Sequence, residues 1–127
     1  MEPERLYLQV NATSVGWSEV RPAVLRGHSG IDHHFAFLAQ KDQAVCSFDI
    51  YDRVTEIEVL RTFTKKIDTG VPVTIVSISG WSEQTAQNLA RSYGIEIIGT
   101  NDIPKFFERS FPAMVKEQQG FPRTTGL

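Results

Sequence analysis

The chain has little cysteine, no long apolar run and no excess of basic residues. Its 127 residues include one cysteine, Cys46, which excludes an internal disulfide and suits a reducing cytoplasm. No apolar stretch approaches the roughly 20 residues that a membrane helix needs. The first five residues lack the basic and apolar character of a signal peptide. We therefore expect a cytoplasmic protein with no membrane partner.

The charge balance also sets bounds on function. Lysine and arginine total 13 and aspartate and glutamate total 15, so the formal net charge is −2. A strong electrostatic nucleic-acid binder usually carries a basic stripe or an overall positive charge. A nuclease is not excluded, because a metal ion held by acids offsets local negative charge. The length predicts a single domain over residues 1–127.

Two apolar runs joined by a short polar turn are the strongest local pattern. Residues 33–39 and 44–51 predict the two strands of a β-hairpin. Side chains alternate between the faces of a strand, so Asp49 and Tyr51 share one face. Asp32 stands at the hairpin entrance and Asp49 near its exit, and these ends are adjacent in an antiparallel pair. Two carboxylates that meet there could hold a divalent cation.

The segment after the hairpin alternates between helical and strand patterns. Apolar residues recur at helical spacing over 54–67, and Gly70 marks the end of that helix. An apolar strand follows over 71–78, then a helix that starts near Ser82, then a strand over 95–98. Strands joined through helices run parallel. We therefore predict an α/β fold with a mixed sheet, antiparallel at the hairpin and parallel beyond it, with helices on both faces.

The N-terminal third gives weaker signals. Leu6, Leu8 and Val10 alternate with polar neighbours and predict a strand over residues 5–11. Residues 17–25 are ambiguous, and the proline within them restricts any strand there to the edge of a sheet.

The C-terminal part is predicted to hold one more helix and then a polar tail. Asn101 or Asp102 would cap a helix that turns Ile103, Phe106 and Phe107 inward. From about residue 113 the tail is expected to be flexible or to form an interface. A homodimer is expected from the aromatic and apolar residues near the termini, namely Trp17, Phe111, Met114, Val115 and Phe121.

The order of these motifs resembles a known family. Gly30 and Asp32 precede a strand, a turn and a strand that ends in an acid-x-Lys position, and this looks like the core of the PD-(D/E)XK nucleases. Within them the chain is most similar to the Mrr-type restriction endonuclease domain, over roughly Ser29 to Phe107. The resemblance implies a three-layer, restriction-endonuclease-like fold and an association with DNA. Mrr-type domains usually begin with a helix, whereas a strand is predicted here.

The resemblance also implies a site. Asp32 and Asp49 would bind a Mg²⁺ ion that activates water for phosphodiester hydrolysis. Glu19 and His34 are candidates to flank that ion. From the residues alone, the simpler interpretation is that Asp32 caps a loop and that Asp49 is a solvated strand end.

One position departs from the family. Tyr51 stands where the acid-x-Lys motif has its lysine. A phenol is neutral at pH 7, so it cannot supply a cation near the scissile phosphate. Lys65 and Lys66 lie more than three helical turns beyond Tyr51, and this separation argues against either as a substitute.

Three functions follow in order of preference. The first is an Mrr-type domain that associates with nucleic acid and has a degraded catalytic site; if active, it would be a Mg²⁺-dependent endodeoxyribonuclease. The alternative is a non-enzymatic protein-interaction or regulatory module on the same fold. A third is a small-ligand sensor with a closed apolar pocket beside Trp81, at the carboxyl ends of the strands.

Overall fold

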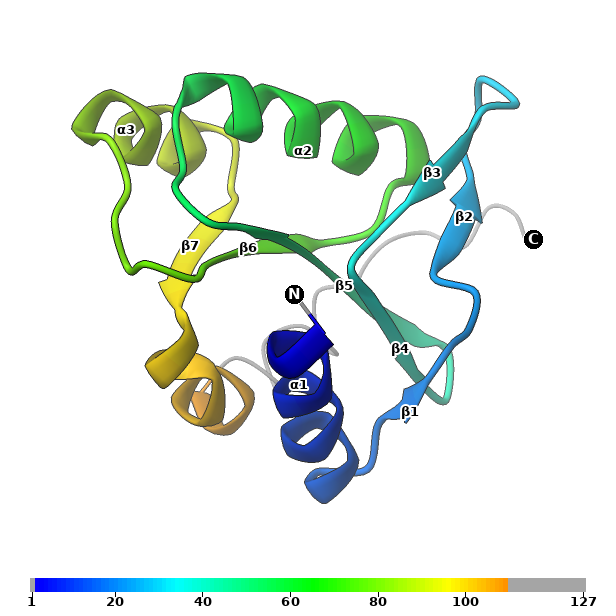
Figure 1. Ribbon diagram of the computed structural model, residues 1–127. Coiled ribbons are helices and arrows are strands. Elements are labelled where there is room, and N and C mark those ends of the chain that lie inside the picture. The colour runs from blue at the N-terminus through cyan, green and yellow to red at the C-terminus, as the bar shows by residue number, and fades with distance from the viewer. Residues whose placement is uncertain (1, 110–127) are drawn as a thin grey trace.

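The computed structural model describes residues 2–109, and a five-stranded sheet lies at their centre (Figure 1). The strand order is β1-β4-β5-β6-β7. The strands are β1 (Ser18–Glu19), β4 (Phe37–Lys41), β5 (Ala44–Tyr51), β6 (Val73–Ser77) and β7 (Glu96–Gly99).

The sheet combines an antiparallel half with a parallel half. Strands β4 and β5 form the predicted hairpin, with Phe37 opposite Phe48 and Lys41 opposite Ala44. Strand β1 pairs antiparallel with β4 at one edge. Strand β6 joins β5 in parallel, which places Ile75 beside Asp49, and β7 joins β6 in parallel. The predicted mixed sheet is therefore confirmed.

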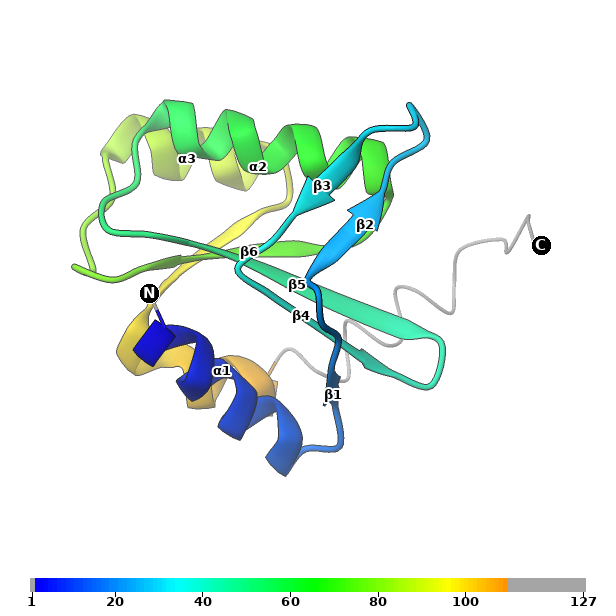
Figure 2. The ribbon, with the colours of Figure 1, turned by 45° about the vertical axis from the view of Figure 1, so that its right-hand side comes forward.

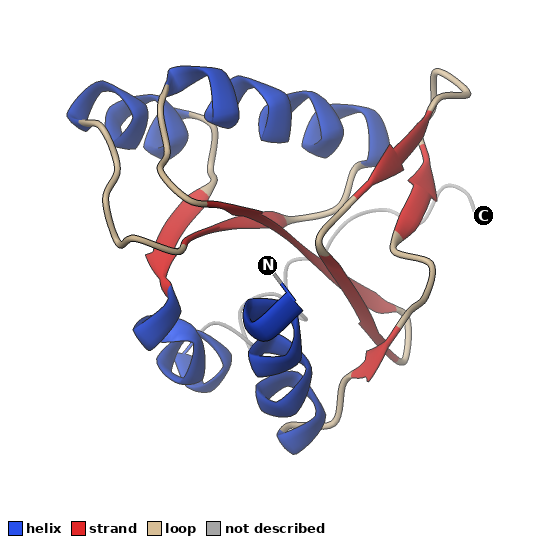
Figure 3. Cartoon of the chain, viewed as in Figure 1, coloured by secondary structure: helices blue, strands red, loops and turns tan. Residues whose placement is uncertain are grey.

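Helices cover both faces of this sheet. Helices α2 (Glu56–Thr69) and α3 (Gln84–Ser92) lie on one face (Figure 2). Helix α1 (Glu2–Ser14) and the helix at 103–109 lie on the other, the latter after the 3₁₀ turn η1 (Thr100–Asp102) (Figure 3). The architecture is the predicted three-layer α/β arrangement.

The main core lies between β5 and the α1 layer. The Phe48 ring is fully buried, and its centroid lies 5.8 Å from Phe37, 5.3 Å from Phe106 and 5.7 Å from Phe107. Cys46 is buried in the same cluster. Burial raises the pKa of its thiol, so it is not a reactive nucleophile. Asp49 and Tyr51, two positions apart on β5, point away from this core and contact α2.

Local sequence signals fix both ends of α2. The Thr55 side chain and Glu58 form a capping box, and the Glu58 carboxylate accepts from the Thr55 main-chain N–H at 2.7 Å. Gly70 ends the helix with φ of 73°, a conformation that favours glycine.

The strand predicted over residues 5–11 is wrong, because this segment is part of helix α1. The residues that α1 buries are Leu8 and Ala12, which are four positions apart, whereas Leu6 and Val10 are exposed. The apparent alternation therefore mixed an inward leucine with two outward residues. Two glutamates in the first turn complement the helix dipole.

The first hairpin strand is also shorter than predicted. Residues 33 and 34 belong to a separate strand, β3 (Asp32–His34), which pairs antiparallel with β2 (Val24–Arg26) in a two-stranded sheet. The Phe35 N–H donates to the Ala23 carbonyl at 2.8 Å and the Ala36 N–H to the Phe48 carbonyl at 3.0 Å. The chain therefore changes partner strand at this point, which a periodicity of two cannot reveal.

The residues that were expected at a dimer interface fall into two groups. Trp17 is buried in the core of its own chain, so it is not available to a dimer interface. Phe111, Met114, Val115, Phe121 and the tail lie outside the described residues.

Within residues 2–109, no helix is both long and apolar enough to cross a membrane.

The aromatic cluster generates a stability prediction. Phe48→Ala should lower the free energy of unfolding by about 3–5 kcal/mol, because it leaves a cavity among three other rings. Leu60→Ala, at an exposed position of α2, should change it by about 0.5 kcal/mol or less. Urea unfolding followed by circular dichroism measures both, and losses of equal size would contradict the packing described.

Candidate functional site

A buried carboxylate lies on the face of β5 that meets α2. Asp49 is 3% exposed. Its Oδ1 accepts from Lys65 Nζ at 2.9 Å. Its Oδ2 accepts from Thr62 Oγ1 at 2.6 Å, and Tyr51 Oη lies 3.4 Å from the same oxygen. We call these four residues the Asp49 cluster.

The sequence of α2 explains how the cluster forms. Thr62 and Lys65 are three positions apart, so they lie on the same side of the helix. Val59 is one turn earlier on that side and, like Thr62, is fully buried. Position 62 faces the Asp49 carboxylate, which needs a hydrogen-bond donor because it is buried. A hydroxyl meets this need, whereas an apolar side chain would not.

Lys65 links three parts of the fold. Besides Asp49, its Nζ donates to the His34 carbonyl at 2.6 Å and lies 5.1 Å from the centroid of the Phe35 ring. The Lys65 side chain is 22% exposed, so the ion pair is only partly screened by water.

The inference that Lys65 lies too far along the chain was wrong, because α2 packs back across β5. Sixteen positions separate Asp49 from Lys65 in sequence, yet their charged groups are in contact. Lys66 points elsewhere and donates to the Tyr93 carbonyl at 2.8 Å.

Tyr51 takes part in the cluster as a neutral donor. Its Oη lies 3.2 Å from Thr62 Oγ1. The single hydroxyl proton of Thr62 is used on Asp49, so Tyr51 donates to Thr62. Burial, reinforced by the negative charge of Asp49, raises the pKa of Tyr51 to about 12. The phenol is therefore protonated at neutral pH.

The other predicted site residues lie apart from this cluster. Asp32 is on β3, where its Oδ1 lies 3.1 Å from Arg26 Nε in an exposed ion pair. Glu19 is on β1 and pairs with Arg5 of α1. His34 contributes its main-chain carbonyl to Lys65. The structure thus brings together Asp49, Tyr51 and the backbone of His34, and gives Asp32 and Glu19 arginine partners of their own.

These donors do not fit a magnesium ion. Mg²⁺ needs an octahedral shell of oxygen atoms from carboxylates, waters and phosphates. Both Asp49 oxygens already accept from protein donors, and one of these donors is a cation. Over residues 2–109 no group of three or more His, Cys, Asp or Glu side chains is placed to hold a metal.

A second polar cluster fastens the β2–β3 hairpin to the end of α2. Asp68 accepts from Ser29 Oγ at 2.6 Å, from the Ser29 N–H at 2.9 Å and from His33 Nε2 at 2.7 Å. The Ser29 hydroxyl and then His33 lower the pKa of Asp68 to about 2. Gly27 allows this approach, since a Cβ at that position would overlap the carboxylate.

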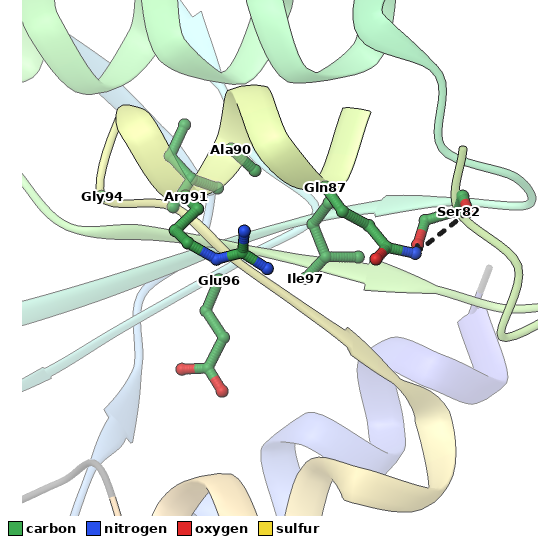
Figure 4. Close-up of a pocket in the computed structure, with 8 residues that line it drawn as sticks. Ser82, Gln87, Ala90, Arg91, Gly94, Glu96 and Ile97 are labelled. Carbon is green, nitrogen blue, oxygen red and sulfur yellow. Dashed lines mark hydrogen bonds between the residues drawn. The ribbon is translucent and has the colours of Figure 1, made fainter. Parts of the chain in front are cut away.

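A groove of about 600 Å³ lies between α3 and β7 (Figure 4). Its lining is mixed in polarity and consists of Ser82, Gln87, Ala90, Arg91, Gly94, Ile95, Glu96 and Ile97. Trp81 is not part of this lining. The groove therefore differs from the closed apolar pocket beside Trp81 that a small-ligand sensor would require.

Comparison with known proteins supports the fold. No family model and no curated protein matches the chain. A solved structure described as "Structure of EndoMS-dsDNA2 complex" is similar, with a TM-score of 0.52 and 15% sequence identity over 77% of this chain and 43% of that one. The chain thus spans less than half the length of that protein. At this identity the likeness shows a shared α/β fold alone.

The Asp49 cluster generates a second stability prediction. Lys65→Met should lower the free energy of unfolding by about 1–3 kcal/mol, because it leaves a buried carboxylate without its cation. Adding Asp49→Asn to Lys65→Met should restore part of the lost free energy of unfolding. The amide is uncharged, so it does not need a cation beside it. Arg26→Gln, which breaks the exposed pair with Asp32, is the control and should cost about 0–1 kcal/mol. Equal losses for Lys65→Met and Arg26→Gln in urea unfolding would contradict the account.

The Asp68 contacts generate a pH prediction. The pKa of this carboxyl falls from 3.8 to about 2 on folding, so its contribution to stability is complete above 3.8 and is lost as pH falls toward 2. Asp68→Asn removes that contribution. Urea unfolding at a series of acidic pH values should therefore give a shallower loss of stability in the variant than in the wild type across this window. Parallel curves would contradict the assignment.

Proposed function

We propose that this chain is a DNA-associated, restriction-endonuclease-like domain that does not cleave DNA. The fold likeness to a protein that is in complex with dsDNA supports the association. The contact between Lys65 Nζ and Asp49 Oδ1 is the main observation in support of the proposal that the domain does not cleave DNA. It commits the carboxylate of the acid-x-Lys position to an internal ion pair.

Phosphodiester hydrolysis requires charge stabilisation that this cluster does not offer. The transition state gains negative charge on the phosphate and needs cations or donors aimed at it. The ammonium of Lys65 is directed at Asp49 and at the His34 carbonyl. Tyr51 is a phenol and is uncharged at neutral pH, and burial and Asp49 raise its pKa further, to about 12. The cluster stabilises the protein instead of a substrate.

The closer kinship that we propose is with Mrr-type domains. The order of a first helix, a hairpin and two further parallel strands with intervening helices supports it. Helix α1 is the element that such domains usually have at their start. The identification of Asp32 and Asp49 as a magnesium pair stays an untested prediction, and the partners described above argue against it.

A protein-interaction module on the same fold is the second candidate. Ile57, Leu60 and Ile67 are exposed and follow one side of α2 at helical spacing. Exposed apolar stripes of this kind are typical of contact surfaces. A homodimer remains a proposal within this candidate, and light scattering at micromolar concentration tests it. A measured mass equal to that of the monomer would refute the homodimer.

The proposed function predicts DNA binding without cleavage. A labelled duplex should bind with the same affinity in Mg²⁺ and in EDTA, and should remain intact on prolonged incubation. Tyr51→Lys restores the lysine of the motif but should stay inactive, because Asp49 remains paired with Lys65. Gel electrophoresis and fluorescence anisotropy measure these outcomes.

The controls for that experiment use Asp49. Asp49→Asn should bind DNA as the wild type does, with folding checked by circular dichroism. Magnesium-dependent cutting by the wild type that is abolished in Asp49→Asn would refute the proposal and make Lys65 the substitute for the missing lysine. Absence of any DNA binding would refute the association itself.

A further inference from the structure

An arginine and a tryptophan are stacked at the surface where β5 and β6 end. Arg53 follows β5, and its guanidinium carbon lies 4.1 Å from the centroid of the Trp81 ring. Trp81 is 41% exposed, whereas Trp17, the other tryptophan of the chain, is 2% exposed. Large aromatic side chains usually bury most of their surface, so an exposed indole beside a cation needs an explanation.

The backbone holds Trp81 in this position. Its N–H donates to Ser79 Oγ at 3.1 Å, and that hydroxyl donates to the Asp52 carbonyl at 2.8 Å. The Trp81 carbonyl accepts from the Val54 N–H at 3.3 Å and from Ser77 Oγ at 2.8 Å. The exposure of the indole is therefore built into a hydrogen-bonded loop.

The two loops that carry the pair lie side by side. A parallel bridge joins Val54 to Ser82, and the loops meet at the left of Figure 1. The carboxyl ends of parallel strands are where open α/β sheets bind their ligands. Arg53 is four residues beyond Asp49, or about 13 Å along an extended chain. The pair contains no member of the Asp49 cluster, although Arg53 is only two residues beyond Tyr51 at the end of the same strand.

We infer that Arg53 and Trp81 form a stacking site for an unpaired nucleic-acid base. Aromatic rings and guanidinium planes both stack on the faces of bases, and they do so with little dependence on sequence. The arginine also supplies positive charge for the adjoining phosphate. Paired bases inside a duplex do not present their faces, so the site selects single-stranded DNA. This inference rests on the proposed association with DNA and adds single-stranded DNA as a form that the chain binds through a site of its own.

The test compares single-stranded and duplex DNA on the full chain. Fluorescence anisotropy with labelled oligothymidylate and with a blunt duplex gives the two affinities. Trp81→Ala should weaken binding of the oligothymidylate by about 5- to 100-fold, the range that loss of one stacked base produces. Trp81→Phe should retain most of the affinity, and Arg53→Gln should lose part of it. Duplex affinity should change little in all three variants.

A matched control separates stacking from charge. Arg91→Gln removes one positive charge from the last turn of α3, at the opposite end of that helix from Trp81. It should leave oligothymidylate binding nearly unchanged. Tryptophan emission gives a second readout, because stacking on Trp81 should quench it in the wild type. The Trp81→Phe variant retains only the buried Trp17 and should show no quenching.

Two outcomes distinguish this inference from the function on which it rests. If the wild type binds DNA but Trp81→Ala and Arg53→Gln both bind oligothymidylate as tightly as the wild type does, the stacking site is refuted and the association with DNA stands. If the wild type binds neither form of DNA, both are refuted.

Discussion

The buried carboxylate on the central strand is the constraint on which the arrangement of this domain depends. Asp49 faces α2 instead of water, and an isolated carboxylate there would cost several kcal/mol. Thr62 and Lys65 meet that requirement from one side of the helix, since each donates a hydrogen bond to one oxygen of the carboxylate. The position of α2 over β5 therefore depends on polar complementarity as well as on the apolar contacts of Val59.

The same side of the helix also places the small two-stranded sheet. Lys65 donates to the carbonyl of His34, and Asp68, three positions later, accepts from Ser29 and His33. The hairpin of β2 and β3 is thus attached to α2 at two points, one turn apart. This explains why Asp32 does not continue into the main sheet: its strand follows the helix, and its carboxylate faces Arg26 across the hairpin.

Much of the fold could be predicted from the sequence, because its strongest patterns are local. The hairpin, the parallel strands and the capping box at Thr55 follow from periodicity and from turn residues. Helix α1 was missed because Leu6 and Val10 are exposed, and they alternate with the buried Leu8 in a way that imitates a strand. The role of Lys65 was missed because it depends on how a helix packs across a strand, which spacing along the chain does not encode. The available signal was Thr62, a polar residue one turn after Val59 on the buried side of α2.

The origin of the cation in the Asp49 cluster affects how relatives of this chain can be found. The ammonium group comes from a helix, so the side chain at position 51 does not have to be a cation. Any residue that packs against Thr62 can occupy this position. A search for an acid and a lysine two positions apart on one strand passes over such chains. A more suitable signature pairs a strand acid with a lysine in the helix that follows the strand, here sixteen positions later, and tolerates any residue between them.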